Sequence, residues 1–162
     1  MNIFVLDIDV KTCAQFHNNR HTVKMILEYS QLLSTAHRIL DGKESVIISD
    51  SGRKKKVWKH PDRDFDYHLY SATHINHPCA IWVRQSDSNY RWLSLLLMHL
   101  CDEYTFRYGK IHKVERDGLL DLLVNNYPKN IKSGSLTKFA LAMPDECKIG
   151  SVVESYRSYY IT

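Results

Sequence analysis

The stretch that decides the fold reads HTVKMILEYSQLLSTAHRIL and covers residues 21–40. It contains neither proline nor glycine, and its apolar residues recur at steps of three and four, which is the pattern of one helix face. Asp41 and Gly42 follow directly, and a glycine at this position predicts the end of the helix. The apolar positions are Val23, Ile26, Leu27, Tyr29, Leu32, Leu33, Ala36 and Leu40.

Outward from this helix, the sequence predicts further short elements and one more long helix. Residues 2–6 are apolar and prone to β structure, so we expect a short strand there, with helix from about Val10. Polar residues 86–89 supply N-cap side chains for a second long helix over residues 90–108, which Gly109 closes. Shorter helices are predicted at residues 79–84, 114–125 and 152–160.

Residues 43–66 form a basic insertion in this helical pattern. Residues 46–48 predict a strand, 49–52 a turn and 53–60 a basic second arm, which together indicate a hairpin or loop. A charge run of this kind fits a solvated loop as well as an arm that contacts phosphates. The predicted fold is mainly α (α+β): a single compact helical domain, residues 1–162, with two long helices, a short N-terminal strand and a small β-hairpin insertion.

Composition excludes several classes of protein. A chain of 162 residues with 44% hydrophobic and 25% charged residues is typical of one soluble globular domain. No apolar run is long enough to span a bilayer, and the first residues lack the basic region of a secretion signal, so we expect a cytoplasmic protein. The 4 cysteines are scattered, without a zinc-ribbon or disulfide pattern, and the net charge of +4 is compatible with a polyanionic partner.

A polar stripe follows the first long helix at alternating steps of four and three. The stripe fits an ordinary amphipathic surface with a Lys24–Glu28 pair, and it fits the wall of a site. In the second interpretation Glu28 is the general base, Lys24 anchors phosphate or acts as the amine nucleophile, and His21 transfers protons together with His77. The stripe consists of His17, His21, Lys24, Glu28, Gln31 and Thr35, with Arg20 at its edge.

A second polar cluster lies in the loop that ends at Pro78 and in the residues after it. Loops rich in histidine and asparagine are typical of sites, because their backbone is free to present side chains. Trp82 and Tyr90 are candidates to stack on a base, although both patterns also fit rings that anchor the core. The predicted substrate-binding residues are Arg20, Gln31, His74, Asn76, Trp82, Arg84, Tyr90 and Arg91.

A metal site is an alternative. His17 and His21 have the spacing of two ligands on one helix, and His37, His74 or His77 can supply a third, with His17, His21 and His74 as the preferred set. The position after His17 is Asn18, so the zinc-peptidase motif is absent. No nucleotide-loop, flavin or nicotinamide motif is present, so no cofactor is predicted beyond a possible divalent metal.

Several blocks of the chain resemble a family of small proteins of tailed bacteriophages, some of which are labelled pyrimidine-dimer DNA glycosylases. The resemblance covers most of the chain outside residues 44–66 and implies a virus-encoded function on DNA or nucleotides. The blocks are residues 1–7, 20–28 and 31–38, residues 76–84 with the sequence NHPCAIWVR, residues 143–146 and residues 156–160.

Glycosylases of the endonuclease V type attack with an N-terminal amine, assisted by a glutamate on the first helix. A residue as large as Asn2 usually leaves the initiator methionine in place, so the resemblance implies Glu28 in the glutamate's role and Lys24 as the amine. We therefore expect an enzyme that acts on DNA or nucleotides at a nucleobase or glycosidic bond. The alternatives are a metal-assisted nuclease or phosphoesterase, and a non-enzymatic anti-defence or host-takeover protein that binds a nucleotide or host protein. The oligomeric state is not predicted.

Overall fold

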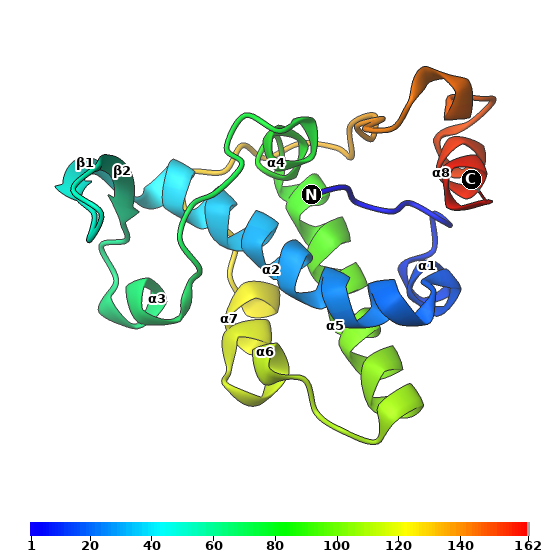
Figure 1. Ribbon diagram of the computed structural model, residues 1–162, viewed down its shortest axis with the longest axis horizontal. Coiled ribbons are helices and arrows are strands. Elements are labelled where there is room, and N and C mark those ends of the chain that lie inside the picture. The colour runs from blue at the N-terminus through cyan, green and yellow to red at the C-terminus, as the bar shows by residue number, and fades with distance from the viewer. Residues whose placement is uncertain (162) are drawn as a thin grey trace.

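Two long helices cross in the middle of the protein, α2 (Asn19–Asp41) and α5 (Asp87–Tyr108), and shorter helices surround them (Figure 1). The computed structural model describes residues 1–161, and within them it confirms a mainly helical fold with a small β-hairpin. The other helices are α1 (Val10–Phe16), α3 (Arg63–His68), α4 (Pro78–Val83), α6 (Lys113–Arg116), α7 (Leu119–Asn125), α8 (Val152–Ile161) and the 3-10 helix η1 (Asp145–Cys147).

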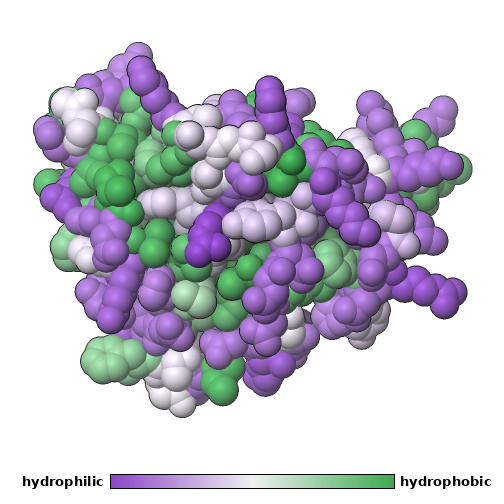
Figure 2. Space-filling view, turned by 180° about the vertical axis from the view of Figure 1, so that it is seen from behind, coloured by the Kyte–Doolittle hydropathy of each residue, from purple (hydrophilic) through white to green (hydrophobic). Residues whose placement is uncertain are grey.

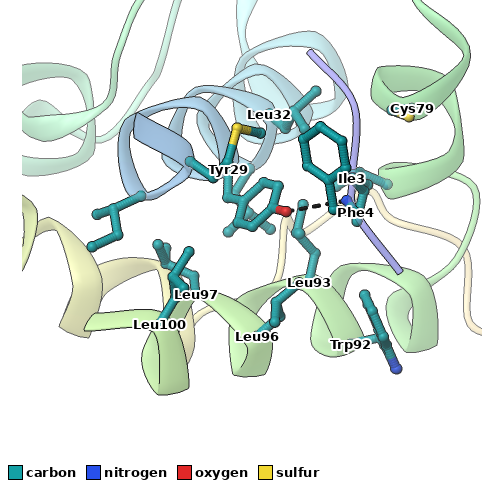
Figure 3. Packing of buried hydrophobic residues seen from close by; sticks show 14 of the residues in the cluster. Ile3, Phe4, Tyr29, Leu32, Cys79, Trp92, Leu93, Leu96, Leu97 and Leu100 are labelled. Atoms are coloured by element: carbon teal, nitrogen blue, oxygen red, sulfur yellow. Dashed lines mark hydrogen bonds between the residues drawn. The ribbon is translucent and has the colours of Figure 1, made fainter. Parts of the chain in front are cut away.

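The core forms where α2 and α5 cross. On α5, buried leucines follow the three-and-four spacing of one helix face, and they pack around the fully buried ring of Tyr29 (Figure 3). Burial of one such leucine side chain contributes about 1.5–3 kcal/mol. No helix in residues 1–161 is both long and apolar enough to cross a bilayer. The leucines are Leu93, Leu96, Leu97 and Leu100.

Residues 2–6 form a buried extended segment, and the predicted N-terminal strand is wrong. The segment runs from α4 to α1 beside α2 without a neighbouring strand (Figure 1). Side chains bind its backbone instead: Phe4 N–H donates to the Tyr29 hydroxyl at 3.1 Å (Figure 3), and Leu6 N–H donates to Cys13 Sγ at 3.4 Å. Because helical side chains satisfy these groups, the segment is buried without a sheet.

The predicted hairpin is confirmed. Strand β1 (Lys43–Ile48) pairs antiparallel with β2 (Lys54–Lys59) at one end of the molecule, with Lys43 opposite Lys59 (Figure 1). Hydrophilic side chains project from this end in Figure 2. The insertion is shorter than predicted, because α3 begins at Arg63, where the Asp62 carboxylate accepts hydrogen bonds from two backbone N–H groups of the first turn.

Two glycines shape helix ends in ways that the sequence pattern did not predict. The helix predicted over residues 114–125 is divided into α6 and α7, because Gly118 takes a left-handed φ of 92° between them. Gly42 ends α2 as predicted, yet its φ of −83° needs no glycine. Its role is steric, since a Cβ there would collide with the Arg38 carbonyl oxygen and crowd Trp58.

Candidate functional site

One carboxylate near the middle of α2 lies next to two amines. The Glu28 Oε1 atom is 3.4 Å from the amino group of Met1, and Oε2 is 3.7 Å from Lys24 Nζ. The Glu28 side chain is 16% exposed and that of Lys24 is 59% exposed, so solvent reaches the pair from the lysine side. We call Met1, Lys24, Glu28 and the neighbouring His77 the amine–carboxylate site.

The structure gives His77 a fixed orientation beside the Met1 amino group. Its Nδ1 accepts a hydrogen bond from Cys79 N–H at 3.1 Å and caps α4, so the neutral ring carries its proton on Nε2. Burial lowers the pKa of His77, and the positive charge of the Met1 amino group lowers it further. A neutral imidazole with its proton on Nε2 is suited to donate a hydrogen bond to a group that gains negative charge.

His21 lies at the edge of the same site, one helical turn before Lys24. Burial lowers the pKa of His21, the Lys24 charge lowers it further, and the Glu28 carboxylate opposes both effects. The His21 ring stacks on Phe4 with 4.4 Å between ring centroids, and its Nδ1 lies 2.6 Å from the Tyr160 hydroxyl. The predicted catalytic residues Lys24, Glu28 and His21 are therefore neighbours on α2, and His77 lies beside the Met1 amino group that contacts Glu28.

The loop before Pro78 follows the polar stripe of α2. Thr73 N–H donates to the Thr35 hydroxyl at 3.2 Å, which fixes the loop against the helix. His74 and Asn76 are exposed in this loop, and His74 has a φ of 50°, a conformation that few non-glycine residues adopt. Of the other predicted substrate-binding residues, Arg20 is exposed and Gln31 is half-buried.

Trp82 and Tyr90 lie in the core, so their predicted role of stacking on a base is wrong. Trp82 is 2% exposed and stacks on Phe139 with 4.9 Å between ring centroids. Tyr90 is 1% exposed, and its hydroxyl donates to the Leu123 carbonyl oxygen at 2.8 Å. Neither ring has a face open to a ligand, and both act as core anchors.

Two further predicted substrate-binding residues are arginines, of which Arg84 is half-buried and Arg91 is exposed. Arg84 donates from Nη1 to the Ala80 carbonyl oxygen at 3.3 Å, and burial lowers the pKa of its guanidinium. Arg91 points outward, with Nη1 3.5 Å from the Tyr127 hydroxyl. Arg91 is the more accessible of the two to a solvent-borne anion.

His17 does not lie on the first long helix, which corrects both the stripe and the metal alternative. It caps the end of α1, and Asn18 starts α2. Its Nδ1 lies 2.8 Å from the Cys13 carbonyl oxygen and its Nε2 lies 2.8 Å from the Tyr29 hydroxyl, so both ring nitrogens are occupied. A metal ion on His17, His21 and His74 would have to break these bonds.

A different histidine cluster is present at the other end of α2, and the sequence analysis did not find it. His37 and Asp41 of α2 meet His60, which follows β2, and one ligand atom from each lies within 4.8 Å of the others. The spacing of His37 and Asp41 places both on one helix face, which was the available sequence signal. The sequence does not show that His60 returns to this face.

Comparison with known proteins adds no relative. No family model, no curated protein and no solved structure matches the chain.

Proposed function

We propose that this protein is an enzyme that acts on DNA at a nucleobase or its glycosidic bond, and that the amine–carboxylate site carries out the reaction. The observation that supports the proposal is the position of Glu28, whose two oxygens face the Met1 amino group at 3.4 Å and Lys24 Nζ at 3.7 Å. An amine beside a carboxylate is the arrangement that covalent catalysis through an imine requires.

The proposed reaction begins when one of the two amines attacks C1′ of a deoxyribose. The amine is neutral at this point, because its ammonium form has given a proton to Glu28. The new N–C1′ bond forms while the bond from C1′ to the base breaks, and the base leaves with the electron pair, accepts a hydrogen bond from His77 and takes the proton held on Glu28. The bonded nitrogen then loses a proton to the Glu28 carboxylate, and its lone pair forms the C=N bond as the C1′–O4′ bond breaks. O4′ takes this proton from Glu28, which gives a protonated imine between enzyme and DNA. Each of these roles is general acid, general base or nucleophilic catalysis by a group of the amine–carboxylate site.

The hairpin supplies a surface for the DNA backbone. Exposed cations follow its second arm, and they give this end of the molecule the character of a phosphate-binding surface. Such contacts position a duplex without reading its sequence, which suits an enzyme that recognises an altered nucleotide. The cations are Arg53, Lys54, Lys55, Lys56 and Lys59.

Borohydride trapping tests the proposed reaction. The protein is incubated with UV-irradiated duplex DNA or with a duplex that contains an abasic site, and borohydride reduces any imine to a stable cross-link. We expect a cross-linked species whose peptide map places the DNA on Lys24 or on the Met1 amino group. Glu28→Gln should lower the yield at least about tenfold, in the range that one general acid or base contributes.

Lys138→Ala is the matched control, because Lys138 is an exposed lysine between α7 and η1 that is not part of the amine–carboxylate site. This variant should cross-link as the wild-type protein does. A cross-link that maps to the hairpin lysines and ignores Glu28→Gln would contradict the proposed site. Absence of any cross-link while the protein binds the same DNA would contradict an imine-forming enzyme and favour a binding protein.

A further inference from the structure

The cluster of His37, Asp41 and His60 contains two buried nitrogen atoms without partners. His37 is 0% exposed and His60 is 5% exposed. Within residues 1–161, His37 Nδ1 and His60 Nε2 have no hydrogen-bond partner. Buried polar atoms are nearly always satisfied, so two in one place indicate that something other than the chain occupies the position between them.

The hydrogen bonds of Tyr90 determine the protonation of His37. The Tyr90 hydroxyl donates its proton to the Leu123 carbonyl oxygen at 2.8 Å. It must therefore accept the proton of His37 Nε2, which lies 2.7 Å away. His37 Nδ1 then carries a lone pair, which is available to a ligand.

The two other members are also held in place. The Asp41 carboxylate accepts N–H bonds from Lys129 at 2.7 Å and Asn130 at 2.9 Å, and its Oδ2 lies 3.9 Å from His60 Nε2. The His60 backbone N–H donates to the Asp66 carboxylate at 2.9 Å, so the backbone that carries the imidazole is fixed. Ligands oriented by a further layer of hydrogen bonds are typical of metal sites.

We propose that His37, Asp41 and His60 bind one divalent transition-metal ion of the zinc type, through His37 Nδ1, an Asp41 carboxylate oxygen and His60 Nε2. Two imidazoles and a carboxylate are a ligand set that zinc and its neighbours favour. Zinc holds such ligands at about 2.0–2.2 Å, which places ligand atoms about 3.3 Å apart. The separation of 3.9 Å between His60 and Asp41 is close to this value.

Metal binding requires one proton to move. His60 Nδ1 accepts the Asp62 N–H at 3.0 Å, so neutral His60 carries its proton on Nε2. The metal displaces this proton, which moves to Nδ1 as the hydrogen bond from Asp62 opens. A water molecule at the same position would need no such shift, because it can accept from His60 Nε2 and donate to His37 Nδ1 and Asp41. A metal ion therefore requires a proton shift on His60 and a water molecule does not, and a metal titration distinguishes the two.

An entry path is present on one side of the cluster. Asp41 and His60 line a cavity of about 900 Å³ at the base of the hairpin. The two ligand nitrogens themselves are covered, so an ion enters from this cavity through local movement of its wall and not through unfolding of the core. The site does not depend on the proposed reaction, because His37 lies nine residues along α2 from Glu28, which is the opposite helix face at about 100° per residue.

Metal titration of the purified full chain tests this inference. The protein is treated with chelator, dialysed and titrated with Zn²⁺, and with Co²⁺ as a spectroscopic substitute. We expect one equivalent of bound metal by elemental analysis, a visible Co²⁺ absorption band, and a higher melting temperature. His60→Gln and Asp41→Asn should each weaken binding at least about tenfold, and Tyr90→Phe, which keeps all three ligands, about 10–100-fold.

His68→Gln is the control, because His68 is a partly exposed histidine of α3 outside the cluster. This variant should bind metal as the wild-type protein does. Circular dichroism without metal shows whether each variant folds. If His60→Gln does not fold, Asp41→Asn provides the test. Failure of both metals to bind, which leaves water in the cluster, would overturn the inference. Binding lost in His21→Gln but kept in His60→Gln would also overturn it.

Discussion

The amine–carboxylate site and the histidine cluster both include a pair of residues four apart on α2, and they differ in what surrounds them. In the first, Lys24 is 59% exposed, so solvent reaches the Lys24–Glu28 pair from the lysine side. In the second, the side chains of Asp41 and His60 are 6% and 4% exposed, and two buried nitrogens lack hydrogen-bond partners among the described residues. The same helical spacing therefore leaves one pair open to solvent and encloses the other, according to what packs against each face.

This difference predicts that substitutions near the closed cluster affect stability most. Arg38 follows His37 and donates hydrogen bonds to four carbonyl oxygens and to the Asp66 carboxylate, while it is 8% exposed. We expect Arg38→Ala to lower the unfolding free energy by about 3–5 kcal/mol, because it leaves four carbonyl oxygens and the partly exposed Asp66 carboxylate without their donor. Urea unfolding measures the change.

Arg63→Ala is the comparison for this prediction, since Arg63 is exposed at the start of α3. Its cost should stay within about 0.5 kcal/mol. Equal losses for both arginines would contradict the view that the base of the hairpin is a closed, cooperative region.

We expect the buried histidine at the end of α1, His17, to have an effect of intermediate size on the unfolding free energy. Burial lowers the pKa of His17 from 6.5 to about 4. Between pH 6.5 and pH 4 the unfolded chain binds a proton at His17 that the folded protein does not bind. The contribution of His17 to the unfolding free energy is therefore fully present above pH 6.5 and is lost as the pH falls toward 4. The loss from His17 should be on the order of 3 kcal/mol.

Urea unfolding at several pH values measures this dependence in wild type and in His17→Gln. The glutamine retains a donor and an acceptor without a titrating ring, so the variant should lose less stability between neutral and acidic pH. His74→Gln replaces an exposed histidine and should follow the wild-type curve. Parallel curves for His17→Gln and wild type would refute the assignment of the effect to His17.

The smallest effect on stability is expected at the open site. Glu28→Gln removes a partly exposed ion pair, which contributes about 0–1 kcal/mol. The same variant should lose the borohydride cross-link, so chemistry and stability separate at this residue. A calorimetric scan measures the change, and a loss as large as that of Arg38→Ala would show that Glu28 is chiefly structural.

Much of the local structure could be predicted from the sequence. The apolar spacing of residues 21–40 predicted α2, the short helix predicted over residues 79–84 corresponds to α4, and the run 53–60 predicted the second arm of the hairpin. These features depend on neighbouring residues along the chain, because capping, helical periodicity and strand pairing across a short turn are local. Gly118 divides one predicted helix, because a single residue with positive φ outweighs a continuous apolar pattern.

The candidate sites were predictable only in part, since they depend on which face of each element is covered. Lys24 and Glu28 were found because they are one helical turn apart. Trp82 and Tyr90 were misassigned because an aromatic residue in the sequence does not show whether its ring is inside or outside. The contact of the Met1 amino group with Glu28 was missed, because it depends on the path of residues 2–6 along α2.

The sequence by itself determined that the chain is helical, that α2 carries a polar stripe, and that a basic hairpin follows it. The tertiary structure alone decided that Tyr29 and Cys13 replace a sheet for residues 2–6, and that His60 returns to His37 and Asp41. The physical reason is the range of the interactions involved. Helix and turn formation depend on backbone geometry over a few residues, whereas burial and the meeting of distant side chains depend on how the whole chain packs.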